Sequence, residues 1–458
     1  MISEPERPSK EAPYTAYDTK YQRKPVTLFS ATLLVIANMI GTGVFTTLGL
    51  QLTSVHSPPS VLLLWIVGGM SAFCGALAYG ELGAIMPRSG GEYPYLSNIY
   101  HPAAGFLSGC ASIVAGFGAP IALAAIALGH YMQAVFPGIN KTAAGVTVIA
   151  VLTMIHLVDV RFGCQFQNVF TASKILLIVV FIAAGFCTPN PQQVVLWEGN
   201  EVETIFSPAF AVALVYVSYA YSGWNASAYV AGEVQKPERN LPVSLFVGTL
   251  FVSICYVLLN FIFLYTVPVE QLTGRIDVAY LSAKAVFGLS GARIVTLLIC
   301  LALVSTLSSM IMAGPRVTQA MGEDIVALKL FAKTNRGGSP VYAVLLQSSV
   351  AVLLAVTSTF NAILTYVGFT LTLFAFLTVL GVFVLRVRKP GIKRPFKMWG
   401  YPVTPAFYLV VNGWMLCYLL IERPFPSAVG LLTAGSALLL YILLARPAKT
   451  SSSREVFK

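Results

Sequence analysis

Two glycines flank a threonine in Met39-Ile40-Gly41-Thr42-Gly43-Val44-Phe45, inside the first long apolar run of the chain, about residues 27–48. Each glycine in a helix interior costs about 1 kcal/mol relative to alanine. In a bilayer, non-helical backbone is tolerated only where protein or a watery cavity receives its polar groups. An interrupted helix can hold a carboxylate on its free N–H groups and an ammonium on its free carbonyls. The stretch therefore predicts the floor of a solute-binding site or, alternatively, a close contact between helices through small residues.

The composition of the whole chain is that of a membrane protein. Of the 458 residues, 57% are hydrophobic and only 10% are charged, whereas soluble domains carry about 25% charged residues. Apolar runs of about 20 residues, enough to cross a hydrocarbon core of about 30 Å, recur from end to end. We expect twelve membrane-spanning helices, near residues 27–48, 59–86, 104–135, 143–159, 166–187, 207–231, 241–267, 291–319, 340–358, 360–386, 403–421 and 426–445.

Basic residues are unequally divided between the two sides of the predicted membrane domain. The side opposite the termini holds only Lys141, Arg275, Lys284, Arg293 and Arg423, and all other basic residues except Lys174 fall on the side of the termini. This asymmetry is the positive-inside signal. It predicts a multi-pass plasma-membrane protein with both termini in the cytoplasm, and it accounts for the net charge of +11 without nucleic acid as a partner.

We expect a tail at each end of the predicted membrane domain, and the cysteines indicate no metal site. We expect residues 1–24 to form a disordered cytoplasmic tail, because they lack the apolar segment of a signal peptide, and residues 447–458 to form a second tail. The membrane domain is expected at residues 25–446. The seven cysteines lie within or at the ends of predicted spans, without a C-x-x-C motif or a clustered Cys/His set. We therefore expect no disulfide framework, no metal and no cofactor.

Three further motifs follow the first stretch along the chain. They are Glu81-Leu82-Gly83 with Pro87-Arg88-Ser89-Gly90-Gly91-Glu92-Tyr93, then Tyr219-Ala220-Tyr221-Ser222-Gly223-Trp224-Asn225, and finally Arg394-Pro395-Phe396-Lys397 with Gly400-Tyr401-Pro402. In this order they resemble the amino acid–polyamine–organocation (APC) transporter superfamily, and most closely its L-type amino acid transporter branch and bacterial relatives. In the first of these motifs we expect Glu81 and Arg88 to form an ion pair at the membrane boundary.

The resemblance implies an all-α, LeuT-like fold with twelve transmembrane helices. Spans one to five (residues 25–190) and six to ten (residues 205–390) would be inverted repeats, and residues 400–446 would add two helices. The residues support this expectation in one respect, because the first and sixth spans both carry glycine interruptions near their middle. Paired discontinuous helices of this kind are typical of the binding sites of such transporters.

Lys174 is followed by a long apolar run in the fifth predicted span. A lysine inside a membrane is a functional candidate, although it can also extend along the helix to the inner surface. The resemblance implies that its ammonium replaces the sodium ion of sodium-coupled members of the fold and contacts backbone near Gly41. It also places Ser305 and Thr306 of the eighth span beside this ammonium, although such hydroxyls often bond only their own helix.

The resemblance further implies a secondary transporter of α-amino acids, and therefore not an enzyme. The carboxylate would bind N–H groups around Thr42 and Gly43, the α-ammonium would bind carbonyls of both interrupted helices, and the aromatic ring of Tyr219 would cover the substrate. The expected substrate-binding residues are Met39, Ile40, Gly41, Thr42, Gly43, Tyr219, Ala220, Ser222, Gly223 and Asn225.

The sequence restricts the class of substrate and the possible energy sources for transport. No acid lies in the core of the predicted first, third, sixth, eighth or tenth span, and an unpaired charge is costly there, so we expect neutral L-amino acids. No phosphate-binding loop is present, and Lys174 argues against sodium coupling. Amino-acid exchange is favoured, with proton symport as the alternative and a non-transporting amino-acid sensor as a further one. Heavy-chain-linked members of the L-type group use a cysteine in the outer loop after the third span. This chain has none there, so the resemblance implies no disulfide-linked heavy chain.

Overall fold

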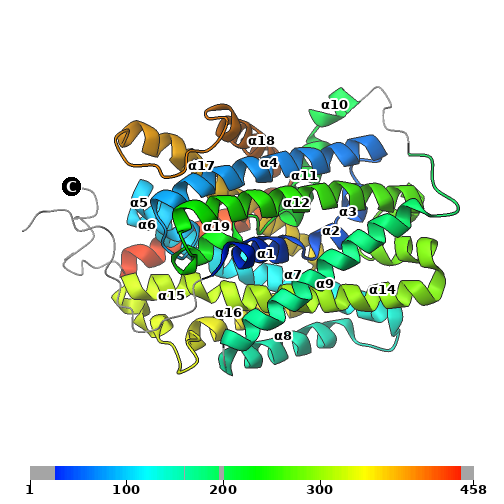
Figure 1. Ribbon diagram of the computed structural model, residues 1–458, viewed down its shortest axis with the longest axis horizontal. Coiled ribbons are helices and arrows are strands. Elements are labelled where there is room, and N and C mark those ends of the chain that lie inside the picture. Colours follow the sequence, from blue (N-terminus) through cyan, green and yellow to red (C-terminus); the bar gives the residue numbers. More distant parts are fainter. Residues whose placement is uncertain (1–25, 159, 195–200, 445–458) are drawn as a thin grey trace, which may run out of the picture.

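The computed structural model describes residues 26–158, 160–194 and 201–444, and these residues are almost entirely helical (Figure 1). The two tails expected at residues 1–24 and 447–458 lie outside the described residues. The helices up to the second interruption are α1 (Leu28–Met39), α2 (Gly43–Thr46), α3 (Leu48–Gln51), α4 (Pro58–Ile85), α5 (Glu92–Ile99), α6 (Pro102–Ala111), the π-helical η1 (Ser112–Gly118), α7 (Ala119–Val135), α8 (Lys141–Val158), α9 (Val160–Phe186), α10 (Glu201–Ile205) and α11 (Pro208–Ala220).

The remaining helices follow the second interruption. They are the 3₁₀-helical η2 (Ala226–Glu233), α12 (Pro237–Thr266), α13 (Val269–Leu272), α14 (Val278–Ala313), α15 (Pro315–Asp324), the 3₁₀-helical η3 (Val326–Ala332), α16 (Val341–Thr357), α17 (Phe360–Arg388), α18 (Val403–Glu422) and α19 (Pro424–Leu444).

The helices of the described chain are those of a multi-pass membrane protein. Nine helical segments are long and apolar enough to cross a membrane, namely Leu28–Thr46, Pro58–Ile85, Pro102–Val135, Lys141–Val158, Pro237–Thr266, Val278–Asp324, Phe360–Arg388, Val403–Glu422 and Pro424–Leu444. Three shorter apolar helices, Phe170–Phe186, Pro208–Ala220 and Val341–Thr357, lie where the fifth, sixth and ninth spans are expected. The multi-pass, all-helical architecture is thus confirmed, and the count of twelve spans and the inverted repeat stay predictions.

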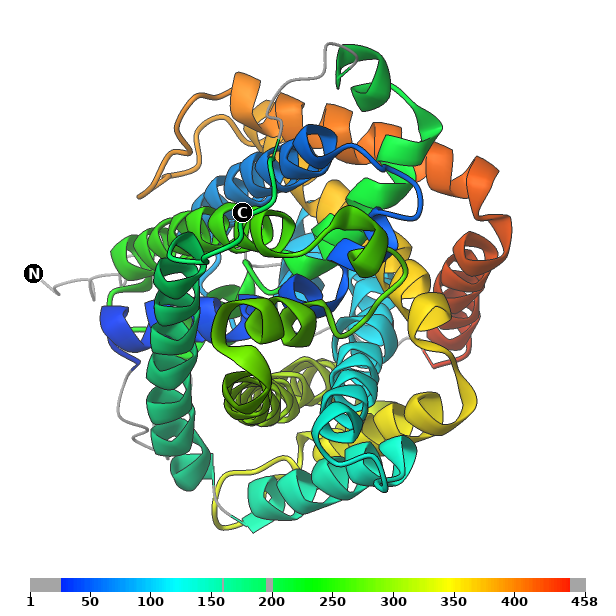
Figure 2. The ribbon, with the colours of Figure 1, turned by 90° about the vertical axis from the view of Figure 1, so that its right-hand side faces the viewer.

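The long helices pack into two groups, and the first interrupted helix belongs to one of them. One is the α12 group, in which α12 packs against α4 and α1, and the other is the α7 group, in which α7 packs against α8, α14 and α16. Helices α4, α12 and α14 run along the long axis of the molecule (Figure 1), and Figure 2 views the bundle nearly along them. Helix α9 packs against both α12 and α14, so it connects the two groups.

Both expected interruptions are present, and glycines bring them into contact. Helix α1 ends at Met39 and α2 begins at Gly43, while α11 ends at Ala220 and η2 begins after a turn at Gly223, which has a φ of 94°. A Cβ on Gly43 would lie 2.3 Å from Cα of Ala220, and one on Gly223 would lie 2.8 Å from the backbone of Asn38. The opening stretch is therefore a close helix contact as well as an interruption, because only glycine permits this approach.

The expected ion pair between Glu81 and Arg88 is wrong. Glu81 is buried on α4 and accepts hydrogen bonds from Arg386 on α17, at 3.0 and 2.6 Å, with the guanidinium of Arg394 at 3.6 Å. Arg88 pairs instead with Asp324 at the end of α15, at 2.8 Å. The turn after α4 carries Arg88 away, whereas Glu81 points into the contact between α4 and α17.

Glu81→Gln should lower the thermal stability of the protein substantially. Removing one partner of a buried ion pair leaves the other uncompensated, at a cost of about 3–5 kcal/mol. The matched control is Asp277→Asn, because the Arg275–Asp277 pair is exposed and such pairs contribute about 0–1 kcal/mol. Thermal unfolding of the purified variants should show a clear fall in Tm for the first and little change for the second. Equal Tm values would contradict a stabilising role for Glu81.

Candidate functional site

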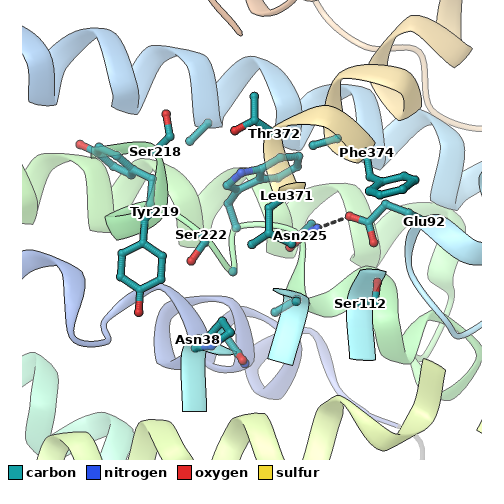
Figure 3. A pocket seen from close by; sticks show the side chains of 18 of the residues that line it. Asn38, Glu92, Ser112, Ser218, Tyr219, Ser222, Asn225, Leu371, Thr372 and Phe374 are labelled. Carbon is teal, nitrogen blue, oxygen red and sulfur yellow. Dashed lines mark hydrogen bonds between the residues drawn. The ribbon is translucent and has the colours of Figure 1, made fainter. Parts of the chain in front are cut away.

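A cavity lies between the two helix groups, beside both interrupted helices (Figure 3). Its walls include residues of α1, α4, the second interruption, η1 and α17. The π-helical turn η1, which the sequence did not predict, lines it with Ser112 and Phe117. Polar groups on its walls include Asn38, Ser112, Tyr219, Ser222, Asn225 and Thr372.

The structure divides the expected substrate-binding residues into two sets. Those that line the cavity are Tyr219, Ser222, Gly223 and Asn225, all on or after α11, and those that do not are Met39, Ile40, Gly41, Thr42, Gly43 and Ala220. The second set is engaged elsewhere. The Met39 carbonyl accepts a hydrogen bond from the Tyr256 hydroxyl, and the Ile40 carbonyl accepts one from Lys174. Binding roles for all ten residues stay predictions.

The hydroxyl of Tyr219 joins the two interrupted helices. It lies 2.8 Å from Oγ1 of Thr42, within hydrogen-bonding distance, and the ring is buried in the last turn of α11. Figure 3 shows the side chain at one end of the cavity, with Asn38 and Ser222 nearby. Because Tyr219 contacts Thr42, the start of α2 is separated from the cavity in this arrangement. Access to α2 would require this contact to break.

The ammonium of Lys174 connects three helices. It is fully buried and donates to the carbonyl oxygens of Ala37 and Ile40, at 3.4 and 3.1 Å, and to Oγ1 of Thr306 at 2.7 Å. In the part of the chain that the structure describes, no carboxylate pairs with it. The amine therefore lies among the same oxygen types that bind hard metal cations, and it ties α9 to the interruption of α1 and to α14.

Of the two hydroxyls expected beside Lys174, only Thr306 contacts it. The Ser305 hydroxyl is buried and has no hydrogen-bond partner. The two residues are consecutive on α14 and point about 100° apart around the helix axis, so one amine cannot face both. Thr306 also bonds Ile40 or its own helix at Ala302, each at 3.1 Å. Thr306, and not Ser305, therefore belongs with Ala37 and Ile40 to the set of residues around the Lys174 ammonium, which we call the lysine site.

Glu92 lines the cavity and was not among the expected site residues. It begins α5 directly after Gly90 and Gly91, whose φ values of 122° and 61° turn the chain back toward the cavity. Its carboxylate accepts hydrogen bonds from Asn225 at 2.6 Å and from Tyr229 at 2.5 Å. The signal in the sequence was an acid after paired glycines, a combination that permits such a turn. Among the described residues, no group of three His, Cys, Asp or Glu side chains could hold a metal ion.

Comparisons with known proteins agree along nearly the whole chain. A family model described as amino acid permease matches residues 26–445. The b(0,+)-type amino acid transporter 1 of Mus musculus is 26% identical over 422 residues, which cover 90% of this chain and 85% of the relative. The large neutral amino acids transporter small subunit 2 of Homo sapiens is 28% identical over 432 residues, which cover 92% and 80%. The b(0,+)-type transporter of Homo sapiens is 26% identical over 418 residues, which cover 88% and 84%.

Proposed function

Because the chain belongs to the amino acid permease family, whose members are transporters and not enzymes, we propose that it exchanges amino acids across the plasma membrane without sodium. Alternating access would open the cavity between the α12 and α7 groups to each side in turn. Both termini would lie in the cytoplasm, as the positive-inside distribution indicates. Residues 25–190 and 205–390 would form the inverted repeats, and the protein would act without a disulfide-linked partner.

The contact of Lys174 with Ile40 and Thr306 is the observation that carries this proposal. In sodium-coupled members of the fold implied by the resemblance, a sodium ion lies at this place. A lysine ammonium supplies the same charge permanently, so the protein would not need to take up sodium in each cycle. Its contacts support the first interrupted helix in both the empty and the loaded carrier. This favours exchange, in which substrate and not a coupling ion drives the return step.

The substrate would contact one wall of the cavity, which is formed by Tyr219, Ser222, Gly223 and Asn225. Residues 39–43 would join it once Tyr219 separates from Thr42, and their N–H groups would then be available to a carboxylate. We expect neutral substrates because no acid lies in the core of the predicted first, third, sixth, eighth or tenth span. Glu92 enters the cavity from a loop, so the choice between neutral and cationic substrates depends on what this carboxylate binds.

Uptake of labelled amino acids into liposomes with purified protein tests the proposed function. An exchanger takes up amino acid only when the liposomes contain amino acid, and an acid outer solution does not replace this requirement. A proton symporter accumulates substrate in empty liposomes when the outer solution is acidified. A sensor binds amino acid, seen as a rise in Tm, and transports none.

Tyr219→Phe should keep most of the transport rate, whereas Tyr219→Ala should lose most of it. Phenylalanine keeps the ring that covers the cavity and loses only the hydrogen bond to Thr42, worth about 0.5–1.5 kcal/mol. Alanine removes the ring and leaves a cavity at a cost of about 3–5 kcal/mol. Initial exchange rates in liposomes measure the difference, and Thr42→Val serves as the control for loss of the hydrogen bond alone. Equal rates for the Ala and Phe variants would contradict the proposal that the Tyr219 ring covers the substrate.

A further inference from the structure

Glu92 is the only charged residue among the described residues that line the cavity. It is 6% exposed, and three neutral groups donate to it. Oε1 accepts from the Tyr79 hydroxyl at 2.8 Å and from Nδ2 of Asn225 at 2.6 Å, and Oε2 accepts from the Tyr229 hydroxyl at 2.5 Å. No lysine, arginine or histidine pairs with it in the described chain. In its ionised form this carboxylate gives the cavity wall a negative charge without a counter-ion among the described residues.

The backbone holds this carboxylate firmly in place. The N–H of Gly90 donates to the Tyr229 carbonyl at 3.1 Å, and a Cβ on Gly91 would lie 2.3 Å from the Tyr229 ring. The Ser89 hydroxyl accepts from the N–H of Gly232 at 3.1 Å. Three consecutive residues of the loop before α5 thus lie against η2. These contacts fix the position of Glu92 in the cavity wall.

The Glu92 carboxylate also determines which atom of the Asn225 amide faces it. An ionised carboxylate only accepts hydrogen bonds, so the amide must turn Nδ2 toward Glu92, and its oxygen then points elsewhere. Figure 3 shows Asn225 between Glu92 and the rest of the cavity. The wall thus places the Asn225 amide against a carboxylate that has no positively charged partner among the described residues. In a site with little water, such a charge strongly favours a nearby cation.

We propose that Glu92 and Asn225 form a subsite for a positively charged nitrogen of the substrate, with Asn225 in contact and Glu92 positioning its amide. This deepens the proposed function and rests on it. The substrate carboxylate would lie toward the other end of the cavity, near Tyr219 and away from the negative charge. Two groups of an amino acid have the required chemistry, namely the α-ammonium and a cationic side chain.

Exchange kinetics of the wild type, Glu92→Gln and Tyr79→Phe in liposomes test the subsite. Leucine, lysine and the 2-hydroxy analogue of leucine serve as substrates or competitors. Glu92→Gln keeps the size of the side chain and removes its charge, so the attraction for a positively charged nitrogen in the cavity is lost. We therefore expect KM to rise about tenfold or more while the maximal rate changes little. A rise for both leucine and lysine assigns the subsite to the α-ammonium, whereas a rise for lysine alone assigns it to the side chain.

Tyr79→Phe is the matched control, because it removes one donor to the same carboxylate from outside the cavity. Its KM values should stay within about twofold of the wild type, because the charge of Glu92 and its hydrogen bonds from Asn225 and Tyr229 remain in place. Unchanged KM values in Glu92→Gln, or an equal rise in Tyr79→Phe, would overturn the subsite. Asn225→Ala offers a second variant if Glu92→Gln does not fold.

The subsite and the proposed function fail in different ways. If the wild type moves no amino acid, exchange fails, and the subsite is then tested by the rise in Tm that lysine or leucine causes. Loss of that rise in Glu92→Gln but not in Tyr79→Phe supports the subsite, and an equal rise in all three proteins overturns it. Active transport with unchanged kinetics in Glu92→Gln leaves exchange intact and removes the subsite alone.

Discussion

Lys174→Ala should reduce amino-acid exchange in liposomes at least about tenfold. The substitution removes a buried cation and takes away the hydrogen bonds that its ammonium donates to the Ala37 and Ile40 carbonyls and to the Thr306 hydroxyl. Each unsatisfied buried acceptor costs about 1–3 kcal/mol, and 1.4 kcal/mol corresponds to a factor of ten. The first interrupted helix would lose its tie to α9 and α14, so both substrate affinity and the exchange rate should fall.

Two neighbouring hydroxyls provide the control for this result. Thr306→Val removes the hydroxyl that contacts Lys174 and keeps the shape of the side chain, so it should reduce exchange in part. Ser305→Ala removes a buried hydroxyl that has no partner, so it should leave exchange unchanged. Initial rates and the KM of each variant measure the difference. A fully active Lys174→Ala, or equal losses in the two hydroxyl variants, would contradict the structural account of the lysine site.

Gly43→Ala should abolish most of the exchange activity and also lower Tm. A Cβ at this position would lie 2.3 Å from Cα and 2.6 Å from Cβ of Ala220. The two interrupted helices would have to move apart, and overpacking of this kind costs about 1–3 kcal/mol or more. The sequence alone suggested a carboxylate-binding role for Gly43, and the structure adds a steric one. Exchange rates in liposomes and Tm of the purified variant test it.

Gly435→Ala on α19 is the matched control, because nothing lies within 4 Å of the added Cβ. It should leave exchange unchanged and raise stability by up to about 1 kcal/mol, since alanine is the better helix former. If Gly43→Ala behaved in the same way, the close crossing of the interrupted helices would not matter for transport.

The sequence predicted the helix interruptions and Lys174 because each carries a local cost that single residues reveal. Glycines in a membrane span weaken the helix, and a lysine in an apolar run needs buried oxygens around it. Neither inference requires knowledge of how the helices rotate or which ones meet. The same holds for the multi-pass architecture, which follows from the length and spacing of apolar runs.

The contacts that the sequence did not predict depend on helix rotation and on distant partners. Thr306 and not Ser305 faces Lys174 because of the rotation of α14, which hydroxyl spacing does not reveal. Glu81 pairs with Arg386, which is 305 residues away in the sequence, and not with the nearby Arg88. Glu92 reaches the cavity through the positive φ angles of Gly90 and Gly91. Because Glu92 lies outside the predicted spans, a search for acids within the spans does not identify it.

Sodium replacement tests the central claim most directly. Purified protein in liposomes loaded with unlabelled amino acid takes up labelled amino acid from an outer solution of either sodium chloride or choline chloride, at equal pH on both sides. Because the Lys174 ammonium supplies the cation, we expect equal initial rates in the two solutions and little uptake into empty liposomes. Uptake that stops when choline replaces sodium would contradict the assignment of Lys174 and the sodium-independent mechanism built on it.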